Sequence, residues 1–426
     1  MKHSKVMEKV YDPRRLRQAW QQVRRNAGAA GIDKMTVEAF ERREDELLQF
    51  IHEKLETGTY RFKPARRVLI PKEGSSKKRG LGIPVVMDRI VSQSINLVFV
   101  WIFDSDFTES NFGFRVGKSQ HRAIRHVQGI IVDGYEWCAS IDLKSFFDEI
   151  PHSLILKLVR RKISDERLVT LIARALKAGV IVDGKFEKTI KGCPQGSPLS
   201  PMLSNIVLNE LDHELERRGH RYCRWADDFL IFVKSERAAN RVMAGIVGYL
   251  EGELNLPVNR EKSKVALCKD ASFLGFQILR DKIRVSKKAR MKFKEKVRRL
   301  TRRNNPLSMY QIIEDLNKYL RGWVSYFGIQ EFKKIFMELD GWIRSRLRSM
   351  QLKKWKNPRK FQRTMMKAGF KPQEARKTWI RMNKWQSVNR PVVRFVMNLK
   401  WFREWGLIFL NDFTRNSSKQ YQLFSR

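Results

Sequence analysis

Three aspartates lie in apolar, strand-like surroundings, where carboxylates are uncommon. Asp142 follows the apolar run in SIDLKSFFD, and Asp227 with Asp228 occupies the turn in RWADDFL. Two divalent cations in nucleotidyl transfer require several hard oxygen ligands at one point, one ion activating the attacking hydroxyl and the other steadying the leaving pyrophosphate. Taken singly, a DD turn is usually a solvated loop tip, and a strand-end aspartate is often a helix cap. Together, with CPQGSPLSP between them, the three aspartates indicate a metal site.

The segments that must position these aspartates alternate between strand and helix patterns. Residues 137–143 predict a short strand, and residues 222–233 predict a strand, a tight turn and a second strand. RRVLIPK and LGIPVV flank GSSKKRG, which predicts a hairpin with a basic tip, and the Gly-rich residues 26–33 predict a loop. Helices are expected over residues 86–103, 151–178 and 202–218. This order predicts an α+β fold, with an antiparallel sheet covered by helices on one face.

Beyond Lys287 the sequence becomes helical and strongly basic. Apolar residues keep a 3–4 spacing over 309–327 and 332–343, which predicts helices packed through core stripes. The net charge is +41, of which residues 281–426, with 38 basic and 10 acidic side chains, carry +28. Solubility alone needs a net charge of only about 2 to 8. The excess favours a polyanion partner over a membrane surface, because no separate amphipathic anchor and no membrane-length apolar run stands out.

Cysteine usage and the N-terminal residues bear on the compartment. The four cysteines have no CxxC spacing, which indicates a reduced compartment and no structural zinc. The N-terminus has no apolar core and does not read as a secretory signal. It is basic like an organellar presequence, but it carries acidic residues and runs directly into an amphipathic helical pattern.

Motifs along nearly the whole chain resemble the group II intron-encoded reverse transcriptases, or maturases. In the family's order they are NAGAAGID, LIPK, RGLGIP, NFGFRVGKSQHRA, DLKSFFDEI, GCPQGSPLSPMLSN, RWADD, VNREKSK, FLGF and LNKYLRGWVSYF. The resemblance implies a right-hand polymerase of the bacterial type, cytoplasmic and nucleoid-associated. The implied domains are an N-terminal extension of the fingers (1–60), fingers and palm (61–286), a helical thumb or maturase domain (287–356) and a basic C-terminal nucleic-acid-binding region (357–426).

The resemblance also implies the catalytic and nucleotide-binding roles. The catalytic metal ligands would be Asp142, Asp227 and Asp228, holding two Mg²⁺ ions, with Mn²⁺ as an alternative. Lys72 and Arg79 would hold the triphosphate, although the same pair could be a merely solvated basic hairpin. Phe147 would close off the sugar 2′ position and select deoxynucleotides, with plain palm packing as the alternative. Gln195 would shape the pocket for the incoming nucleotide.

Primer and template contacts are implied at four further positions. Gly31 lies in the motif that matches an N-terminal loop over the template. Asn259 and Lys262 match the motif after the acidic turn, in a supporting or a contacting role. Trp225 stands where the family usually has Tyr, so it keeps an aromatic platform beside the primer end and loses a hydroxyl. A second departure is the C-terminus, where no Cys- and His-rich endonuclease domain is expected.

The sequence thus predicts an RNA-directed DNA polymerase, a nucleotidyltransferase that extends a DNA primer on an RNA template. Its expected partners are deoxynucleoside triphosphates, the RNA template with its DNA primer, and an intron RNA that it helps to splice and mobilise, with no membrane partner. Alternatives are a splicing cofactor without polymerase activity, disfavoured by the complete aspartate set, and a domesticated enzyme of DNA repair or phage defence. An RNA-copying RNA polymerase is disfavoured by Phe147.

Overall fold

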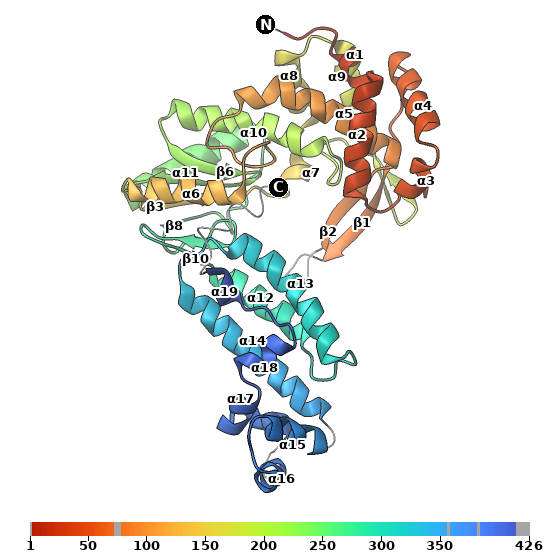
Figure 1. The fold of residues 1–426 in the computed structure, drawn as a ribbon. Coiled ribbons are helices and arrows are strands. Elements are labelled where there is room, and N and C mark those ends of the chain that lie inside the picture. Colours follow the sequence, from red (N-terminus) through yellow and green to blue (C-terminus); the bar gives the residue numbers. More distant parts are fainter. Residues whose placement is uncertain (1, 72–77, 356–357, 381–383, 415–426) are drawn as a thin grey trace. The chain divides into compact units, whose positions relative to one another are not determined.

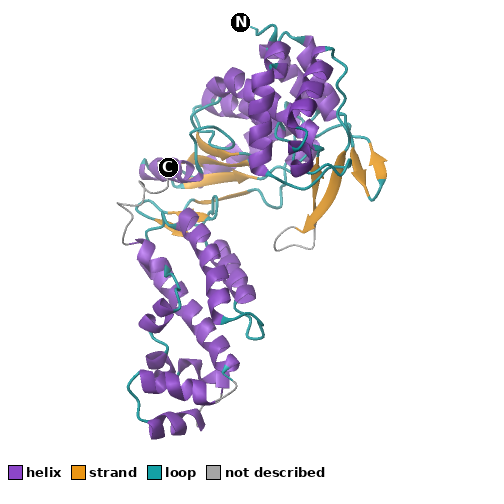
Figure 2. Cartoon of the chain, turned by 45° about the vertical axis from the view of Figure 1, so that its right-hand side comes forward, coloured by secondary structure: helices purple, strands orange, loops and turns teal. Residues whose placement is uncertain are grey.

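The chain forms two compact units, Met1–Cys268 and Lys269–Arg426, called unit 1 and unit 2 below. The computed structural model describes residues 2–71, 78–355, 358–380 and 384–414. Unit 1 runs from red to green and unit 2 from teal to blue in Figure 1. Unit 1 mixes helices with strands, whereas unit 2 is mostly helical (Figure 2). The mixed α+β fold predicted from the sequence is confirmed.

Helices supply most of unit 1. They are α1 (Val6–Tyr11), α2 (Pro13–Asn26), α3 (Val37–Glu41), α4 (Glu44–Glu56), α5 (Val86–Phe103), η1 (Asp104–Asp106), α6 (Gln120–Val132), α7 (Phe146–Glu149), α8 (His152–Lys162), α9 (Glu166–Leu176), α10 (Ser200–Arg217) and α11 (Glu236–Gly252). The apolar helix α5 has the predicted bounds. By length and composition it could cross a membrane, but most of it is buried inside unit 1, as in the core helix of a globular protein.

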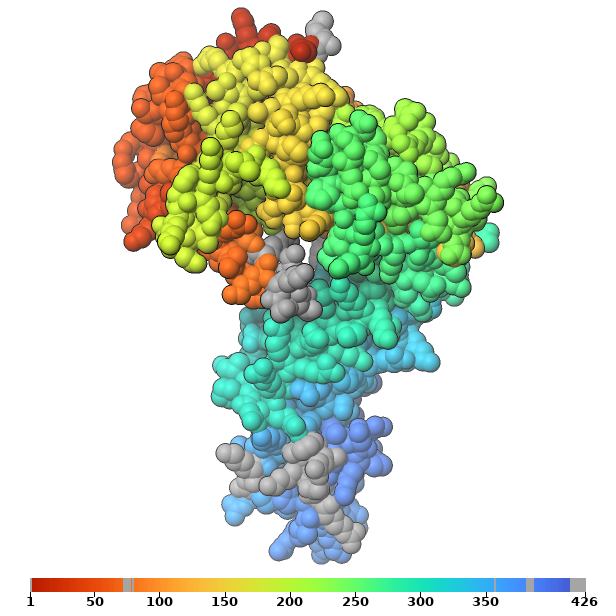
Figure 3. All heavy atoms as spheres, turned by 180° about the vertical axis from the view of Figure 1, so that it is seen from behind, coloured from red at the N-terminus to blue at the C-terminus, as the bar shows by residue number. Residues whose placement is uncertain are grey.

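The predicted helix over 151–178 is instead two helices, α8 and α9. They are separated at Asp165, whose side chain accepts a hydrogen bond from the Arg167 N–H and caps α9. The other oxygen of this carboxylate accepts from the Met7 N–H at 2.8 Å. The N-terminal residues therefore pack on the α8–α9 connection, red against yellow in the space-filling view (Figure 3). The helix is interrupted because one capping side chain serves two backbone segments.

The first sheet of unit 1 has the strand order β2-β1-β4-β5. Its strands are β1 (Ala65–Pro71), β2 (Lys78–Ile83), β4 (Val180–Val182) and β5 (Lys185–Glu187). The antiparallel β1–β2 pair, running from Arg66↔Ile83 to Pro71↔Lys78, confirms the predicted hairpin. The hairpin tip, residues 72–77, lies outside the described residues.

The second sheet has the order β6-β7-β3-β8, and all its neighbours are antiparallel. Its strands are β3 (Trp137–Ile141), β6 (Arg221–Trp225), β7 (Asp228–Val233) and β8 (Lys264–Leu267). The central strand β7 is buried at every position after Asp228, because the helices α6, α10 and α11 pack against this sheet. Burying a phenylalanine such as Phe229 contributes about 1.5 to 3 kcal/mol, so the sheet is a rigid base for its loops.

Unit 2 begins with a hairpin and continues as helices. Its elements are β9 (Phe276–Ile278), β10 (Ile283–Val285), α12 (Lys287–Leu300), α13 (Met309–Phe327), α14 (Lys333–Lys354), α15 (Pro358–Lys367), α16 (Pro372–Ile380), η2 (Lys384–Asn389), α17 (Pro391–Val396), α18 (Leu399–Glu404) and α19 (Leu410–Thr414). The predicted apolar stripes form its core. A capping box at Ser308 fixes the start of α13.

The C-terminal segment returns along the helices of unit 2. The Asn317 side chain on α13 donates to the Gly406 carbonyl at 2.8 Å and accepts from the Ile408 N–H at 3.1 Å. One apolar core runs from Val285 to Leu410. Apolar packing therefore joins residues 287–356 and the later helices in a single unit. The division between the units also lies at Cys268, before the expected palm boundary at residue 286. The assignment of a separate function to each of the four predicted segments stays a prediction.

Candidate active site

Asp142 follows the last residue of β3, and its backbone is fixed on both sides. Its N–H donates to the Ser263 Oγ at 3.1 Å, and its carbonyl accepts from the Asn259 N–H at 2.7 Å. The Ser263 hydroxyl in turn donates to the Asn259 carbonyl at 2.9 Å. The loop before β8 therefore sets the point from which the Asp142 carboxylate extends. Asn259 and Ser263 thus support the backbone of Asp142, while a contact of Asn259 with primer or template stays a prediction.

The acidic turn joins β6 to β7 in the same sheet. Trp225 pairs with Asp228 across the turn, leaving Ala226 and Asp227 at its tip. Ala226 has φ 56°, a left-handed conformation that costs a residue with a Cβ about 1 to 2 kcal/mol. The strained conformation makes the tight reversal possible, so that Asp227 and Asp228 follow at the very end of the hairpin.

The strand register brings Asp142 to the acidic turn. Strand β3 pairs with β7 through Ile141↔Phe229, so the next position in this register sets Asp142 beside Asp228. Opposite residues of an antiparallel pair direct their side chains to the same face. All three predicted metal ligands therefore stand at one end of one sheet, although they are far apart in the sequence.

Carboxylate oxygens are the donors that Mg²⁺ prefers, so the three aspartates fit a divalent cation in donor chemistry and backbone placement. Among the residues that the structure describes, no three His, Cys, Asp or Glu side chains are gathered closely enough to form a ligand cluster. The Lys262 ammonium lies 3.7 Å from the Asp142 carboxylate, and both side chains are partly exposed. Lys262 thus partly neutralises a candidate metal ligand in this structure.

Phe147 lies in α7, close after Asp142, and its carbonyl accepts from the Cys193 N–H at 2.7 Å. The ring is half-buried, with its centroid 5.5 Å from that of Phe146. Gly192 has φ 88°, and a Cβ there would lie 2.9 Å from the Phe147 carbonyl oxygen. Both Phe147 and the start of the PQG loop are therefore held by one close backbone contact.

His152 supports the same loop, and the sequence analysis missed it. Its Nε2 lies 2.9 Å from the Gly192 carbonyl oxygen, while its buried Nδ1 has no hydrogen-bond partner. Burial lowers the pKa of His152, which favours the neutral ring with the proton on Nε2 as donor. A buried histidine beside a proline gave no sequence signal because its partner is a backbone carbonyl 40 residues away.

Gln195 lies in the loop that contacts strand β2. Its carbonyl accepts from the Gly82 N–H at 2.8 Å. A Cβ at Gly196 would lie 2.2 Å from the Gly82 carbonyl oxygen, so only glycine permits this approach. Strand β2 also carries Arg79, whose backbone pairs with Ile70. Lys72, the other predicted triphosphate contact, lies outside the described residues.

Residues 70–278 match the reverse transcriptase (RNA-dependent DNA polymerase) family, and residues 290–369 match the maturase-specific domain of group II introns. The chain is 36% identical to protein YkfC of Escherichia coli over 61% of this chain and 78% of that protein. The chain belongs to the reverse transcriptases with a group II intron maturase domain. Enzymes of this family act on nucleic acids with divalent metal ions, and the predicted family and enzyme class are confirmed.

Intron-encoded proteins are among the relatives of this reverse transcriptase. The group II intron-encoded protein LtrA of Lactococcus lactis is 28% identical over 66% of this chain and 57% of its own length. A putative COX1/OXI3 intron 1 protein of Saccharomyces cerevisiae is 29% identical over 54% of this chain and 34% of its own length. The chain thus spans little more than half of LtrA and a third of the yeast protein.

The N-terminal loop of this reverse transcriptase is fastened to the hairpin and to α5. The Arg66 guanidinium donates to the Ala30 carbonyl at 2.8 Å, and Arg89 donates to the Ala29 carbonyl. Gly31 is buried, and a Cβ there would lie 2.7 Å from the Val85 Cα. Gly31 is therefore a packing position at the base of the loop, and its template contact stays a prediction. Neither arginine was identified from the sequence.

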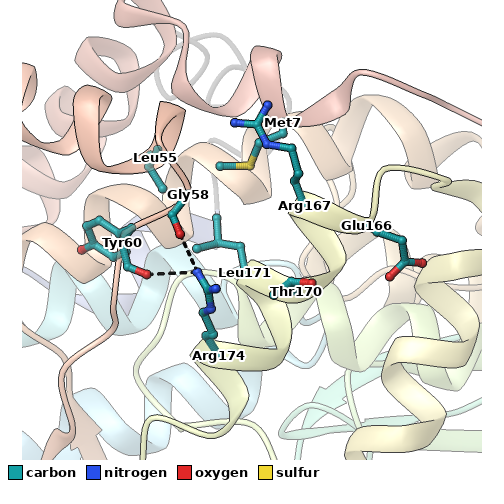
Figure 4. Close-up of a pocket in the computed structure, with 9 residues that line it drawn as sticks. All are labelled: Met7, Leu55, Gly58, Tyr60, Glu166, Arg167, Thr170, Leu171 and Arg174. Atoms are coloured by element: carbon teal, nitrogen blue, oxygen red, sulfur yellow. Dashed lines mark hydrogen bonds between the residues drawn. The ribbon is translucent and has the colours of Figure 1, made fainter.

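A cavity of about 290 Å³ lies elsewhere in unit 1, between α1, the end of α4, and α9 (Figure 4). Met7, Leu55 and Leu171 give it an apolar lining. The Arg174 guanidinium at its edge donates to the Gly58 carbonyl at 2.9 Å. The arginine thus satisfies backbone carbonyls just beyond α4, and the one carboxylate among the lining residues, Glu166, is paired with Arg160.

Proposed function

We propose that Asp142, Asp227 and Asp228 hold two Mg²⁺ ions, with Mn²⁺ as an alternative, while the enzyme extends a DNA primer along an RNA template. The register Ile141↔Phe229 is the observation that carries this assignment, because it brings the strand end and the acidic turn together. Bound ions would activate the primer 3′-hydroxyl and offset charge on the leaving pyrophosphate. The protein's own contribution is placement: Asn259 and Ser263 fix the backbone of Asp142.

The incoming deoxynucleotide would lie between Phe147 and the fingers hairpin. Phe147 would exclude a 2′-hydroxyl, and its half-buried ring and the bond from the Cys193 N–H to its carbonyl support this role. The backbone bond between Gln195 and Gly82 joins the pocket loop to β2. Lys72 and Arg79 would bind the triphosphate from the same hairpin. Trp225, partly exposed beside Asp228, would stack on the primer end.

The basic unit 2 supports an intron RNA as a further partner. The maturase-specific domain covers 290–369, and residues 281–426 carry a net charge of +28. A charge of this size favours phosphate contacts with counterion release. We infer a role in splicing and mobility of that intron, in the cytoplasm of a bacterium near the nucleoid. Preferential binding of a folded group II intron over a duplex RNA of equal length would support this partner, and equal affinity would contradict it.

Primer extension by single aspartate variants tests the metal site. On oligo(dT) annealed to poly(rA) with Mg²⁺, Asp142→Ala and Asp227→Ala should each lose more than about 1,000-fold in rate, because several kcal/mol of charge stabilisation disappear. RNA affinity should stay near the parental value. Asp133→Ala, at the exposed end of α6, is the matched control and should extend normally. Substantial extension by Asp227→Ala would overturn the assignment.

A further inference from the structure

A fully buried ion pair lies beneath the acidic turn of unit 1. Arg224 on β6 and Asp212 on α10 are both 0% exposed. The Arg224 Nε donates to both carboxylate oxygens of Asp212, at 2.8 and 3.0 Å, and its Nη2 donates to the second oxygen. Removing two charges from water is costly, so a pair of this kind is weak evidence for stability. Its position beside the acidic turn points instead to a geometric role.

The third nitrogen of Arg224 reaches the turn itself. Its Nη1 donates to the Ala226 carbonyl at 3.0 Å and to the Asn205 Oδ1 at 2.9 Å. The Asn205 amide, buried on α10, donates to the Gly113 carbonyl at 2.8 Å. One guanidinium therefore ties the turn to α10, and Asn205 ties α10 to the segment beside the turn.

Gly113 confines the turn from the other side. A Cβ at Gly113 would lie 2.2 Å from the Ala226 N, so any larger residue would displace the turn. The flanking backbone is paired as well. The Phe112 N–H donates to the Arg224 carbonyl, and the Arg224 N–H donates to the Ser110 carbonyl, each at 2.9 Å. Ala226 is thus held in its left-handed conformation between a fixed carbonyl bond and a close backbone contact.

The bond to the Ala226 carbonyl acts on the next residue. A peptide group is planar, so fixing this carbonyl also fixes the plane of the Asp227 N–H and the direction in which the Asp227 chain continues. We infer that Arg224, with Asp212 and Asn205, is the positioning unit that fixes the backbone from which the Asp227 and Asp228 side chains extend beside Asp142 for metal binding. This role rests on the proposed metal site and adds residues that touch neither metal nor substrate.

The unit also links two parts of the active site. Helix α10 begins at Ser200, directly after the PQG loop that contacts β2 and Phe147. The same helix carries Asn205 and Asp212, which hold Arg224. A single rigid helix thus sets both the nucleotide-pocket loop and the acidic turn. If the Arg224 bonds are lost while α10 stays in place, metal binding should change and the nucleotide pocket should change little.

Apolar replacement separates positioning from stability. In the double variant Arg224→Met with Asp212→Leu, two apolar side chains of similar size replace the pair, which commonly preserves or raises stability, but the bond to Ala226 is lost. Arg224→Lys keeps the charge opposite Asp212 and lacks the planar fork, so it cannot hold Asp212, Asn205 and Ala226 at once. Leu211→Ala, a fully buried neighbour on α10, is the control that loses stability without touching the turn.

Mn²⁺ binding, followed by electron paramagnetic resonance on the full chain, gives a readout independent of catalysis. The double variant should melt within a few degrees of the parent, bind Mn²⁺ at least about tenfold more weakly and extend a primer at least about tenfold more slowly. The Mn²⁺ affinity and the extension rate of Arg224→Lys should lie between those of the parent and the double variant. Leu211→Ala should melt earlier, with parental Mn²⁺ affinity and parental Mg²⁺ dependence measured below its melting temperature.

Each outcome decides one of the two claims. Parental Mn²⁺ affinity and rate in a folded double variant would overturn the positioning unit and leave the metal site standing. If the double variant melted earlier, as Leu211→Ala should, and lost rate with unchanged Mn²⁺ affinity, Arg224 would be purely structural, which also overturns the inference. If Asp227→Ala extended primers as fast as the parent, the metal assignment itself would be refuted.

Discussion

Each unit buries a carboxylate, but the two have different partners. In unit 1, Asp212 faces the guanidinium of Arg224, so charge is matched by charge. In unit 2, Asp340 on α14 accepts two backbone bonds of 2.9 Å, from the Leu410 and Asn411 N–H groups. Burial raises the pKa of Asp340 to about 6. A paired charge can fix a geometry through directed hydrogen bonds, whereas Asp340, whose pKa is raised by burial, is sensitive to pH.

Breaking the unit 1 pair should have the largest effect. Asp212→Ala leaves the Arg224 guanidinium buried without its carboxylate, which costs about 3 to 5 kcal/mol. Urea unfolding of the full chain should detect this loss. The double apolar variant, as the control, should restore stability but not metal binding. If Asp212→Ala were as stable as the parent, water would have to reach Arg224, and the contrast between the buried pair and Asp340 would be wrong.

A second buried carboxyl of unit 1, Asp88, should be sensitive to pH. Asp88 accepts from the Tyr60 hydroxyl at 2.7 Å and the Lys63 N–H at 2.9 Å, and burial raises its pKa to about 7. Because the folded pKa is raised, its contribution to stability is complete below about pH 4 and is lost as pH rises through 7. The loss should amount to about 2 to 4 kcal/mol.

Asp88→Asn should remove this pH dependence. Hydrogen exchange of residues 60–65 in the full chain, measured from pH 5 to 8 and corrected for intrinsic rates, reports the local opening. The parent should open more readily as pH rises, and Asp88→Asn should open equally at each pH. If both proteins changed in parallel, another group would be responsible.

Removing the unit 2 carboxyl should have a smaller effect than breaking the buried pair. Asp340→Ala deprives two backbone N–H groups of α19 of their acceptor, at a cost of about 1 to 3 kcal/mol. The sign of its pH dependence is that of Asp88: stability is complete below about pH 4 and is lost as pH rises through 6. Hydrogen exchange should increase in residues 406–413, with primer extension unchanged at 25 °C. Unaltered exchange there would show that the apolar core alone holds this segment.

Nucleotide selection should depend on unit 1 alone. Phe147→Val removes the half-buried ring beside the PQG loop, and discrimination against ribonucleotides should fall about 10- to 200-fold, the range expected for a change of pocket volume. The ratio of kcat/KM for dTTP and UTP on poly(rA) measures it. A matched change in unit 2, Trp342→Val, should leave the ratio intact. An active Phe147→Val protein with the parental ratio would place sugar selection elsewhere.

The smallest expected effect concerns the basic face of unit 2. Lys294 and Arg298 on α12 lie 5.7 and 5.6 Å from the Trp342 ring centroid, and neither side chain is buried. Lys294→Gln and Arg298→Gln should each reduce the slope of log affinity against log salt by about 0.7 to 0.9 if each contacts one phosphate. Lys157→Gln on the exposed face of α8 is the control. Slopes equal to the parent's would remove these residues from the RNA-binding surface.

Local patterns in the sequence predicted the elements and the residue types of the site. The apolar run of α5, the hairpin β1–β2 and the strand–turn–strand around Asp227 agree with the structure because each depends on neighbours within a few residues. The motifs also predicted the family, which the comparisons confirm. The helix break at Asp165 was missed, since its side chain caps α9 while also binding the distant Met7 N–H.

The sequence by itself determined which aspartates stand at strand ends and where the positive charge lies. Only the tertiary structure decided that Asp142 stands beside Asp228, because register is fixed by side-chain packing across strands that are far apart in the chain. It also decided the roles of Arg224, Asp212, His152 and Ser263. Their partners are buried backbone groups or charges from other elements, and burial makes such groups pair with whatever the fold brings within reach.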